Sequence, residues 1–324
     1  MEIGFVVIGR NEGPRLRSCL ESVGAASNRI VYADSGSTDD SVALAQELGA
    51  ATVALPDDGN LTAARGRNAG YGELRKLHPQ CDAVMFLDGD CILQARFLQQ
   101  AAAFLEQHPE IAVVCGRRFE RYPEASIYNR LCDIEWDTPV GQADECGGDA
   151  LVRCAAFDAV GGYRSDLRAG EEPEMAARMR AAGWKIWRID APMTQHDAKI
   201  LKLSQWWRRA QRGGFGYAQV WSATKPLSHR LYGKQLRSAL TWTLALPAIV
   251  IIVAVLTGQA WILLAIPASY ALQFFRIGSR SHAEGKWTRA ALLLLAKIPE
   301  TIGALQFTLT GTKRRVPEYK SNGG

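Results

Sequence analysis

The chain has 324 residues, enough for one large α/β domain with an appended segment. Hydrophobic residues make up 48% of the sequence and charged residues 22%, a balance that excludes an intrinsically disordered chain. The net charge of +5 is modest and the basic residues form no single run, so we expect no nucleic-acid partner. They crowd instead between residues 202 and 237 and around the late apolar segments, which is typical of a protein at a membrane surface.

The start of the chain and its cysteines indicate a cytoplasmic, reducing environment. The apolar run Ile3–Ile8 follows an acidic residue and is shorter than the core of a secretory signal peptide. The seven cysteines are scattered, odd in number and never spaced as Cys-x-x-Cys, which argues against a zinc site and a disulfide framework. We therefore expect the N-terminal domain to lie in the cytoplasm.

Short apolar runs alternate with helical patterns in the first half of the chain. We expect strands at residues 3–8, 29–33, 51–55 and 83–87, with helices between them at 15–23, 41–48 and 60–77. Strands separated by helices predict a parallel, doubly wound sheet, in which ligands bind beyond the carboxyl ends of the strands. Polar residues follow three of these strands, so three polar loops should meet at one edge of the sheet.

Asp88-Gly89-Asp90 is the candidate metal site. It comes directly after an apolar strand, and two carboxylates on a tight turn can share a hard divalent cation. Gly89 gives the backbone the freedom to approach that cation. Mg²⁺ or Mn²⁺ held there would neutralise a diphosphate and make it a better leaving group. The same three letters also make ordinary turns, so the position at a strand end carries the argument.

Other polar residues near the strand ends are candidates for binding a nucleotide. Asp34 follows the second expected strand and can accept hydrogen bonds from a base or a ribose, while the chain turns from Ser35 onward. Glu12, in the first loop, is placed to reach the same nucleoside. Arg65 and Arg67 lie near the start of a helix and can meet phosphates, although solvated surface arginines are commoner.

An acidic cluster begins a later helix and offers a candidate general base. Glu171, Glu172 and Glu174 precede a helical pattern, and Pro173 fits a first helical turn. The functional interpretation is that one carboxylate takes the proton from an acceptor hydroxyl. The alternative is that acidic side chains are simply favoured at a helix start by its dipole.

After about residue 200 the sequence indicates a membrane segment. Residues 201–237 interleave tryptophan with arginine, which fits a helix in the headgroup region, although a solvent-facing helix with a buried Trp edge is the alternative. Residues 238–257 and 260–275 are uncharged and predict a transmembrane hairpin, against the alternative of a core hairpin. Basic residues flank both of its ends, which places both ends in the cytoplasm. Residues 290–310 carry Lys297 and Glu300 near the middle, so we expect an interfacial or re-entrant helix there.

Together these motifs resemble the family 2 glycosyltransferases of the GT-A fold, over about residues 3–200. The matching motifs stand in the family's order: Arg10-Asn11-Glu12, Asp34-Ser35-Gly36-Ser37-Thr38-Asp39, Ala64–Gly70, Asp88-Gly89-Asp90, Gly147-Gly148-Asp149-Ala150, Gly161-Gly162-Tyr163, and Glu171-Glu172 with Glu174, Arg178 and Gly183-Trp184. The resemblance implies an α/β catalytic domain with a Rossmann-like, mostly parallel sheet. It also implies an inverting, metal-dependent transfer of a sugar from a UDP- or GDP-type donor.

The resemblance assigns roles residue by residue. Glu172 stands where the family has its catalytic aspartate, with Glu171 as the fallback, and His196 resembles a histidine that completes the site for Mg²⁺ or Mn²⁺ with Asp88 and Asp90. The nucleotide-sugar would contact Arg10, Glu12, Asp34, Ser35, Arg65, Arg67, Asp88 and Gly89. The acceptor would contact Gly148, Asp149, Trp206, Arg209 and Arg212. The membrane half resembles family members that build bacterial exopolysaccharides and lipid-linked glycans.

These expectations divide the chain into a catalytic domain (1–200), an interfacial segment (201–237), a transmembrane hairpin (238–276) and a final cytoplasmic part with a basic tail (277–324). We expect a multi-pass inner-membrane protein that acts on a polyprenyl-linked acceptor among membrane lipids; a homo-oligomer is compatible with this arrangement. One alternative is addition of the sugar to polyprenyl phosphate itself. Alternatives from other classes are a nucleotidyltransferase, a phosphatase or a non-catalytic membrane scaffold.

Overall fold

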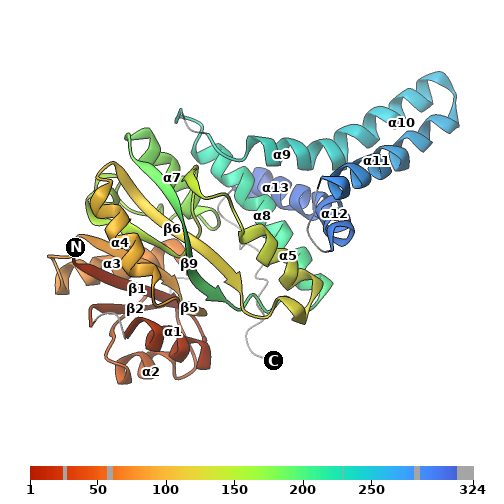
Figure 1. Ribbon diagram of the computed structural model, residues 1–324. Coiled ribbons are helices and arrows are strands. Elements are labelled where there is room, and N and C mark those ends of the chain that lie inside the picture. The colour runs from red at the N-terminus through yellow and green to blue at the C-terminus, as the bar shows by residue number, and fades with distance from the viewer. Residues whose placement is uncertain (25–27, 57–60, 229, 281–284, 312–324) are drawn as a thin grey trace. The chain divides into compact units, whose positions relative to one another are not determined.

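The computed structural model describes residues 1–24, 28–56, 61–228, 230–280 and 285–311 (Figure 1). The described chain forms two compact units. Of the described residues, the first comprises Met1–Lys199 with Ala223–Leu231, and the second comprises Ile200–Ser222 with the residues between 232 and 311. Residue 60, where the sequence predicts a helix to begin, and the basic tail predicted after residue 311 lie outside the described residues.

The first part of the sheet has the parallel, doubly wound topology that the sequence predicts. Its strands run in the order β3-β2-β1-β4 and all pair in parallel. The strands are β1 Ile3–Gly9, β2 Ile30–Asp34, β3 Ala51–Ala54 and β4 Ala83–Asp88, and the helices between them are α1 Pro14–Gly24, α2 Ser41–Glu47 and α3 Ala63–Leu77. Each strand therefore ends at the same edge, where the polar loops follow.

The same sheet continues past β4 with strands of mixed direction. β8 pairs antiparallel with β4, β6 antiparallel with β8, β9 parallel with β6, and β5 and β7 antiparallel with β9. These strands are β5 Cys91–Leu93, β6 Ile111–Glu120, β7 Gly141–Ala143, β8 Ala150–Arg153 and β9 Lys185–His196. The helical elements around them are α4 Phe97–Gln107, η1 Pro123–Ala125, α5 Ile127–Trp136, α6 Cys154–Ala159 and α7 Glu171–Ala181. Parallel pairing therefore joins β1–β4 throughout and recurs between β6 and β9, whereas the other pairs of this part are antiparallel.

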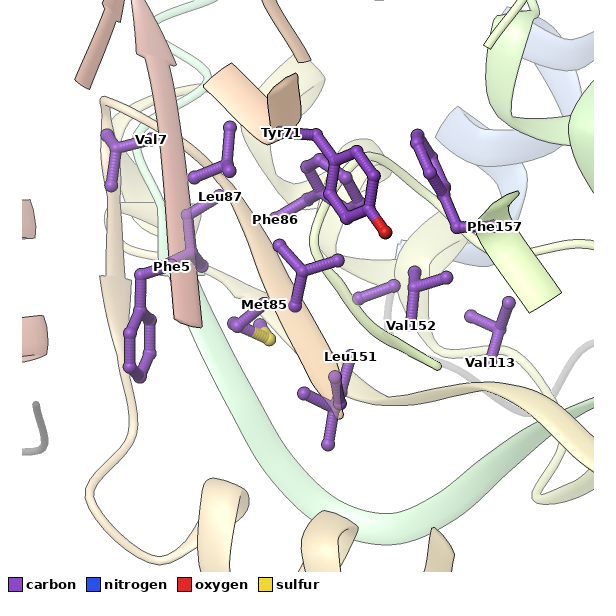
Figure 2. Close-up of a cluster of buried hydrophobic side chains, with 14 of the residues drawn as sticks. Phe5, Val7, Tyr71, Met85, Phe86, Leu87, Val113, Leu151, Val152 and Phe157 are labelled. Atoms are coloured by element: carbon purple, nitrogen blue, oxygen red, sulfur yellow. The ribbon is translucent and has the colours of Figure 1, made fainter. Parts of the chain in front are cut away.

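The core lies against the central strands, which are buried on both faces. Figure 2 shows apolar side chains from β1, β4, β6 and β8 packed with Tyr71 of α3 and Phe157 of α6. The ring centroids of Tyr71 and Phe157 lie 4.4 Å apart. Strands that are buried on both faces read as continuous apolar runs, which is why β1 and β4 are recognisable in the sequence.

Helix α3 approaches the sheet closely because of a glycine. A Cβ atom at Gly70 would lie 2.4 Å from Cγ1 of Val6 on β1. Since real Cβ atoms do not come that close, only glycine allows this helix–strand distance. The same face of α3 carries Ala64, Arg67 and Tyr71, all of them buried. A cation on this core-facing side is unusual, and its partners belong to the functional site.

The second unit is helical, and its three long apolar helices are Gly233–Thr257, Ala260–Ser279 and Lys286–Thr310 within the part of the chain that is described. Each is long and apolar enough to cross a membrane, with mean hydropathies of 2.5, 1.4 and 1.4. The unit comprises α8 Leu203–Ala223, α9 Gly233–Leu240, η2 Thr241–Ala245, α10 Leu246–Thr257, η3 Ala260–Leu264, α11 Ala265–Ser279, α12 Lys286–Leu295 and α13 Lys297–Thr310. The first two long helices contain the segments predicted to form the hairpin.

The third long helix differs from the first two in its polar contacts. It breaks at Ala296 into α12 and α13, and Lys297 forms an ion pair of 2.7 Å with Glu300 inside it. The hydroxyl of Thr243 donates a hydrogen bond to the carbonyl of Lys297. A larger share of this helix is buried within the protein than of the other two. Its interfacial or re-entrant placement stays a prediction.

Helices α8 and α13 cross at two glycines. A Cβ at Gly214 would lie 1.9 Å from the carbonyl oxygen of Glu300, and a Cβ at Gly303 would lie 1.9 Å from that of Gln211. Beside the crossing, Gln211 donates a 3.0 Å hydrogen bond to Gln306. Small residues allow two helix backbones to approach in this way, as they do in membrane proteins.

Candidate functional site

The loops that follow β1 and β2 are joined by Asn11. Its backbone N–H donates to the hydroxyl of Ser37 over 2.9 Å, and its side-chain oxygen accepts from the N–H of Thr38 over 2.7 Å. Asn11 has φ +54°, a left-handed conformation that asparagine tolerates better than most residues. No local pattern in the sequence predicts this role for Asn11, although it stands between two predicted site residues.

Asp34 is buried and is bonded by its own loop. Its carboxylate accepts hydrogen bonds from the N–H groups of Gly36 and Ser37, at 3.0 and 2.9 Å, and from the hydroxyl of Tyr32 at 3.1 Å. These contacts fix the turn after β2, where Ser35 is half-buried. A nucleotide contact by Asp34 stays a prediction.

The other first-loop candidates lie at the edge of the site. Arg10 is exposed, and Glu12 forms an ion pair of 2.8 Å with Arg15, the second residue of α1. Glu12 also approaches the next loop, because a Cβ added to Gly89 would lie 3.3 Å from its Cγ. The loops after β1 and β4 are therefore neighbours, as the sheet topology requires.

The turn Asp88-Gly89-Asp90 joins β4 to the short strand β5. Gly89 donates its N–H to the carbonyl of Ile8 over 2.7 Å, and a Cβ there would lie 3.1 Å from that oxygen. Cys91, the first residue of β5, pairs with His196 at the end of β9. This pairing brings Nε2 of His196 within 3.4 Å of an Asp90 carboxylate oxygen.

Asp90 and His196 are suited to hold a metal ion. Both are buried, and Nδ1 of His196 has no hydrogen-bond partner among the residues that the structure describes. Burial, with Arg118 nearby, lowers the pKa of His196 to about 4, so its imidazole is neutral at pH 7 and has a lone pair to offer. Among the described residues, ligand atoms of Asp90, Cys91 and His196 lie within 4.8 Å of one another. A site of carboxylates with one imidazole suits Mn²⁺, which accepts both oxygen and nitrogen ligands. Mg²⁺ prefers oxygen ligands, so it would be held by the carboxylates.

Asp149 supports this turn from behind. It is fully buried, and it accepts hydrogen bonds from the backbone N–H of Asp88 at 3.0 Å and from the hydroxyl of Thr194 at 2.8 Å. Nη2 of Arg118 lies 2.6 Å from the same carboxylate and 3.4 Å from that of Asp88. These contacts tie Asp149 to the Asp88 turn. Contact of Asp149 with an acceptor stays a prediction.

Arg118 and Thr194 were not predicted as site residues. They lie opposite each other in the pairing of β6 with β9, so the same register that aligns the two strands brings both to Asp149. No local motif marks either residue. Only the strand pairing between distant parts of the chain could have identified them.

Arg67 joins the aspartate side of the site to the glutamates. Its guanidinium is buried; Nη2 donates to Asp88 over 2.9 Å, and Nη1 donates to Glu171 over 3.0 Å and to Glu172 over 2.9 Å. Gly148 lies directly against it, since a Cβ at that position would be 2.2 Å from Nη2. The structure therefore brings Arg67, Gly148, Asp88 and both glutamates together in one place.

The two glutamates begin helix α7. Gly170, which precedes them, has φ +81°, a conformation that glycine adopts without strain and that turns the chain into the helix. Burial and the neighbouring charge of Glu171 raise the pKa of Glu172 to about 7. A carboxylate with a pKa near neutrality is well suited to accept a proton from a hydroxyl. The third acidic residue, Glu174, pairs instead with Arg178 at 2.8 Å and stabilises the helix.

Comparison with known proteins connects this site to a family. The model of glycosyl transferase family 2 matches residues 5–160. The matched span contains the three polar loops, Arg67 and Asp149. Residues 5–160 form a family 2 glycosyltransferase domain.

Curated relatives of this glycosyltransferase extend the match along the chain. It is 22% identical over 238 residues to the O-antigen chain rhamnosyltransferase RfbN of Salmonella typhimurium, covering 68% of this chain and 74% of the relative. It is 23% identical to the O-antigen chain rhamnosyltransferase WbaN of Salmonella anatum, over 60% of this chain and 64% of that one. It is 33% identical to the succinoglycan biosynthesis protein ExoA of Rhizobium meliloti, but over 28% of this chain and 26% of that protein.

Solved structures share the fold of the glycosyltransferase. The mannosyltransferase PcManGT from Pyrobaculum calidifontis, in complex with GDP-Man and Mn²⁺, superposes with a TM-score of 0.62 and 18% identity, over 94% of this chain and 87% of that one. S. aureus TarS, residues 1–349, gives a TM-score of 0.53 at 12% identity, over 97% and 93% of the two chains. The catalytic domain has the GT-A fold that the sequence motifs imply.

The remaining site candidates of the glycosyltransferase lie on helices α3 and α8. Arg65 is half-buried on α3, where the hydroxyl of Thr62 caps the helix by accepting its N–H. Trp206, Arg209 and Arg212 lie on α8 in the second unit; Trp206 is buried and the two arginines are half-buried. Their contact with an acceptor stays a prediction.

Proposed function

We propose that this glycosyltransferase moves a sugar from a nucleotide-sugar to a lipid-linked acceptor during O-antigen or exopolysaccharide synthesis, with inversion at the anomeric carbon. The observation that best supports this proposal is that the guanidinium of Arg67 donates hydrogen bonds both to the aspartate that ends β4 and to the two glutamates that begin α7. A donor-side and an acceptor-side carboxylate thus share one site. The names of the curated relatives, two O-antigen rhamnosyltransferases and a succinoglycan protein, support the type of product.

In this proposal the donor side is built on Asp88, Asp90 and His196. These residues would hold Mg²⁺ or Mn²⁺, which supplies positive charge to a departing diphosphate. Asp149 and Arg118 keep Asp88 in place through the contacts described above. The loops that Asn11 joins carry the nucleoside, with Asp34 fixing their shape. The complex of PcManGT with GDP-Man and Mn²⁺ supports a nucleotide-sugar and a divalent cation as ligands.

The acceptor side is built on Glu172. Its carboxylate takes the proton of the acceptor hydroxyl, the hydroxyl oxygen forms a bond to the anomeric carbon, and the bond from that carbon to the diphosphate oxygen breaks. A single displacement of this kind inverts the configuration. A general base contributes about 10²–10⁴-fold to such a step.

The second unit would attach the enzyme to the membrane. Helices Gly233–Thr257 and Ala260–Ser279 have the length and hydropathy of a transmembrane hairpin. Basic residues flank the uncharged stretch 238–275 of the hairpin at both ends: Arg230, Lys234 and Arg237 before it, and Arg276, Arg280, Lys286 and Arg289 after it. By the positive-inside rule, both ends and the catalytic domain lie on the cytoplasmic face of the inner membrane.

Separate substitutions of the two glutamates test the proposal. Nucleotide-sugars are screened with the purified protein and a membrane lipid extract, and release of nucleoside diphosphate is measured. Glu172→Gln should lower kcat by about 10²–10⁴-fold because it removes the base. Glu171→Gln should have a smaller effect, and Asp166→Asn, at an exposed ion pair with Arg164, should leave kcat unchanged.

Full activity of Glu172→Gln would remove the general-base role. If that activity required a free polyprenyl phosphate as the acceptor, the enzyme would make the lipid-phosphate sugar itself, since an ionised phosphate needs no base.

A further inference from the structure

We propose that Arg67 is a positioning residue of the transfer reaction: it acts through Glu172, whose carboxylate it fixes beside the Asp88 turn. The inference rests on the proposed function, in which Glu172 is the base. It gives Arg67 a different role from the contact with donor phosphates that its place in the sequence suggests.

The hydrogen bonds of Arg67 are committed to carboxylates. Its side chain is 3% exposed, and both terminal nitrogens are within 3.0 Å of carboxylate oxygens on β4 and α7. One planar guanidinium thereby fixes three side chains from two elements. Because the donors of a planar guanidinium point in fixed directions, they set both the distance and the direction of these partners.

The surroundings of the guanidinium are shaped to hold it in place. Gly148 leaves the space that Nη2 occupies, because a Cβ there would lie 2.2 Å away. The ring of Tyr163 lies 5.5 Å from Cζ, within the range of a cation–π contact. A phosphate-binding arginine needs a face open to its ligand, whereas this one is enclosed by glycine, an aromatic ring and carboxylates.

Arg67 also controls the charge at Glu172. The groups that act on Glu172 are Glu171 of the same helix, Arg67 of α3 and Asp88 of β4, with Tyr163 and Cys146 close by. Arg67 lowers the pKa of Glu172, whereas burial, Glu171 and Asp88 raise it. Without the guanidinium, Glu172 should hold its proton to a higher pH and lose its fixed orientation.

Two substitutions of Arg67 separate its charge from its geometry. Arg67→Met removes both, whereas Arg67→Lys keeps a positive charge but loses the planar fork. Arg75→Met is the matched control: Arg75 lies on the same helix, where it bonds the carbonyls of Pro79 and Cys81. Glu172→Gln completes the set. Each variant is assayed for kcat over a range of pH, and binding of UDP and GDP with Mn²⁺ is measured by calorimetry.

We expect kcat of Arg67→Met to fall about 100-fold, the loss typical of a misplaced reacting group, while nucleotide affinity changes less than about threefold. The acid limb of its pH profile should move to higher pH. Arg67→Lys should lose kcat in a similar way but keep the acid limb nearer to that of the unmodified enzyme. If Arg67→Met fails to fold, Arg67→Lys serves as the test, because a positioning role predicts a lower kcat with nearly unchanged nucleotide affinity.

Two results would overturn the inference while leaving the proposed function intact. In one, Arg67→Met weakens UDP or GDP binding with kcat unchanged, which would make Arg67 a donor ligand. In the other, Arg67→Met keeps the kcat and pH profile of the unmodified enzyme while Glu172→Gln is inactive. Full activity of Glu172→Gln would instead remove the proposed base, and the role of Arg67 with it.

Discussion

Individual residues in this site are held by buried charge pairs. Asp149 and Arg118 lie 2.6 Å apart with the carboxylate fully buried, and the hydroxyl of Thr194 and the N–H of Asp88 also donate to Asp149. Buried pairs of this kind contribute little net stability, but removal of one partner leaves the other charge without compensation. Their value here is the fixed position of Asp88.

Asp149→Asn should therefore be strongly destabilising. We expect the free energy of unfolding to fall by about 3–5 kcal/mol, because Arg118 keeps its charge and loses the nearer of its two carboxylate partners. Denaturant unfolding of the purified protein measures this loss. At the exposed pair of Arg164 and Asp166, Asp166→Asn should cost about 0–1 kcal/mol. Equal effects at the two sites would contradict the structural role given to Asp149.

The pH dependence of activity should report on Glu172. Burial and Glu171 raise its pKa to about 7, and only the ionised form can accept a proton. Activity should then fall as the pH drops through about 7, rather than near the usual range of a glutamate at about 4.3. A kcat profile of the unmodified enzyme checks this. Activity that stays constant from pH 7 down to pH 5 would argue against Glu172 as the base.

At this scale the sequence predicts residues in local motifs and misses those that distant strands bring in. Asp88, Asp90, Glu171 and Glu172 were identified because a strand end or a helix start marks them. Arg118 and Thr194 depend on the pairing of β6 with β9, whose register no local pattern reveals. The joining role of Asn11 was missed for the same reason, since its partners lie in the next loop.

At the scale of helices and strands, the first half of the domain follows directly from its sequence. Strands β1–β4 are buried runs separated by helices, and the predicted segments agree with the observed ones to within a few residues. The strands between residues 91 and 196 are not predicted from the sequence. Three of the strands there, β5, β7 and β8, have only three or four residues, and the direction of each strand is set by pairing with distant partners.

The crossing of α8 with α13 gives a test at the level of elements. Gly303→Ala should destabilise the second unit by about 1–3 kcal/mol, because its Cβ would press on the backbone of Gln211. Gly213→Ala on α8 has nothing within 4 Å of the added atom, so it should stabilise the helix by about 0.5–1 kcal/mol. Thermal unfolding in detergent micelles compares the two. Opposite signs are expected, and two stabilising substitutions would contradict the close crossing.

For the whole molecule, the number of membrane crossings decides where the chain ends. Two crossings, with Lys286–Thr310 held at the interface, would put the C-terminus on the same side of the membrane as the catalytic domain. Three crossings would put the C-terminus on the opposite side. The third helix would then carry the ion pair of Lys297 with Glu300 into the membrane. Composition alone does not separate these cases, because all three helices are long and apolar enough to span.

Reporter fusions resolve this topology. A fluorescent protein fused to the C-terminus should fluoresce, and alkaline phosphatase fused there should be inactive, as expected in the cytoplasm. A fusion after Gly258, at the turn between α10 and η3, should give the opposite pattern because it marks the far end of the hairpin. An active phosphatase at the C-terminus would show that the third helix crosses.

The most direct test of the account is transfer itself. Radiolabelled nucleotide-sugars are incubated with the full-length protein, Mn²⁺ or Mg²⁺ and lipid extracted from the native membrane, and label is followed into the lipid phase. We expect one nucleotide-sugar to label the lipid and release nucleoside diphosphate, and both signals to disappear with EDTA or with Asp88→Asn and Asp90→Asn combined. Label transfer that persists unchanged without a divalent cation or without these two aspartates would contradict the account.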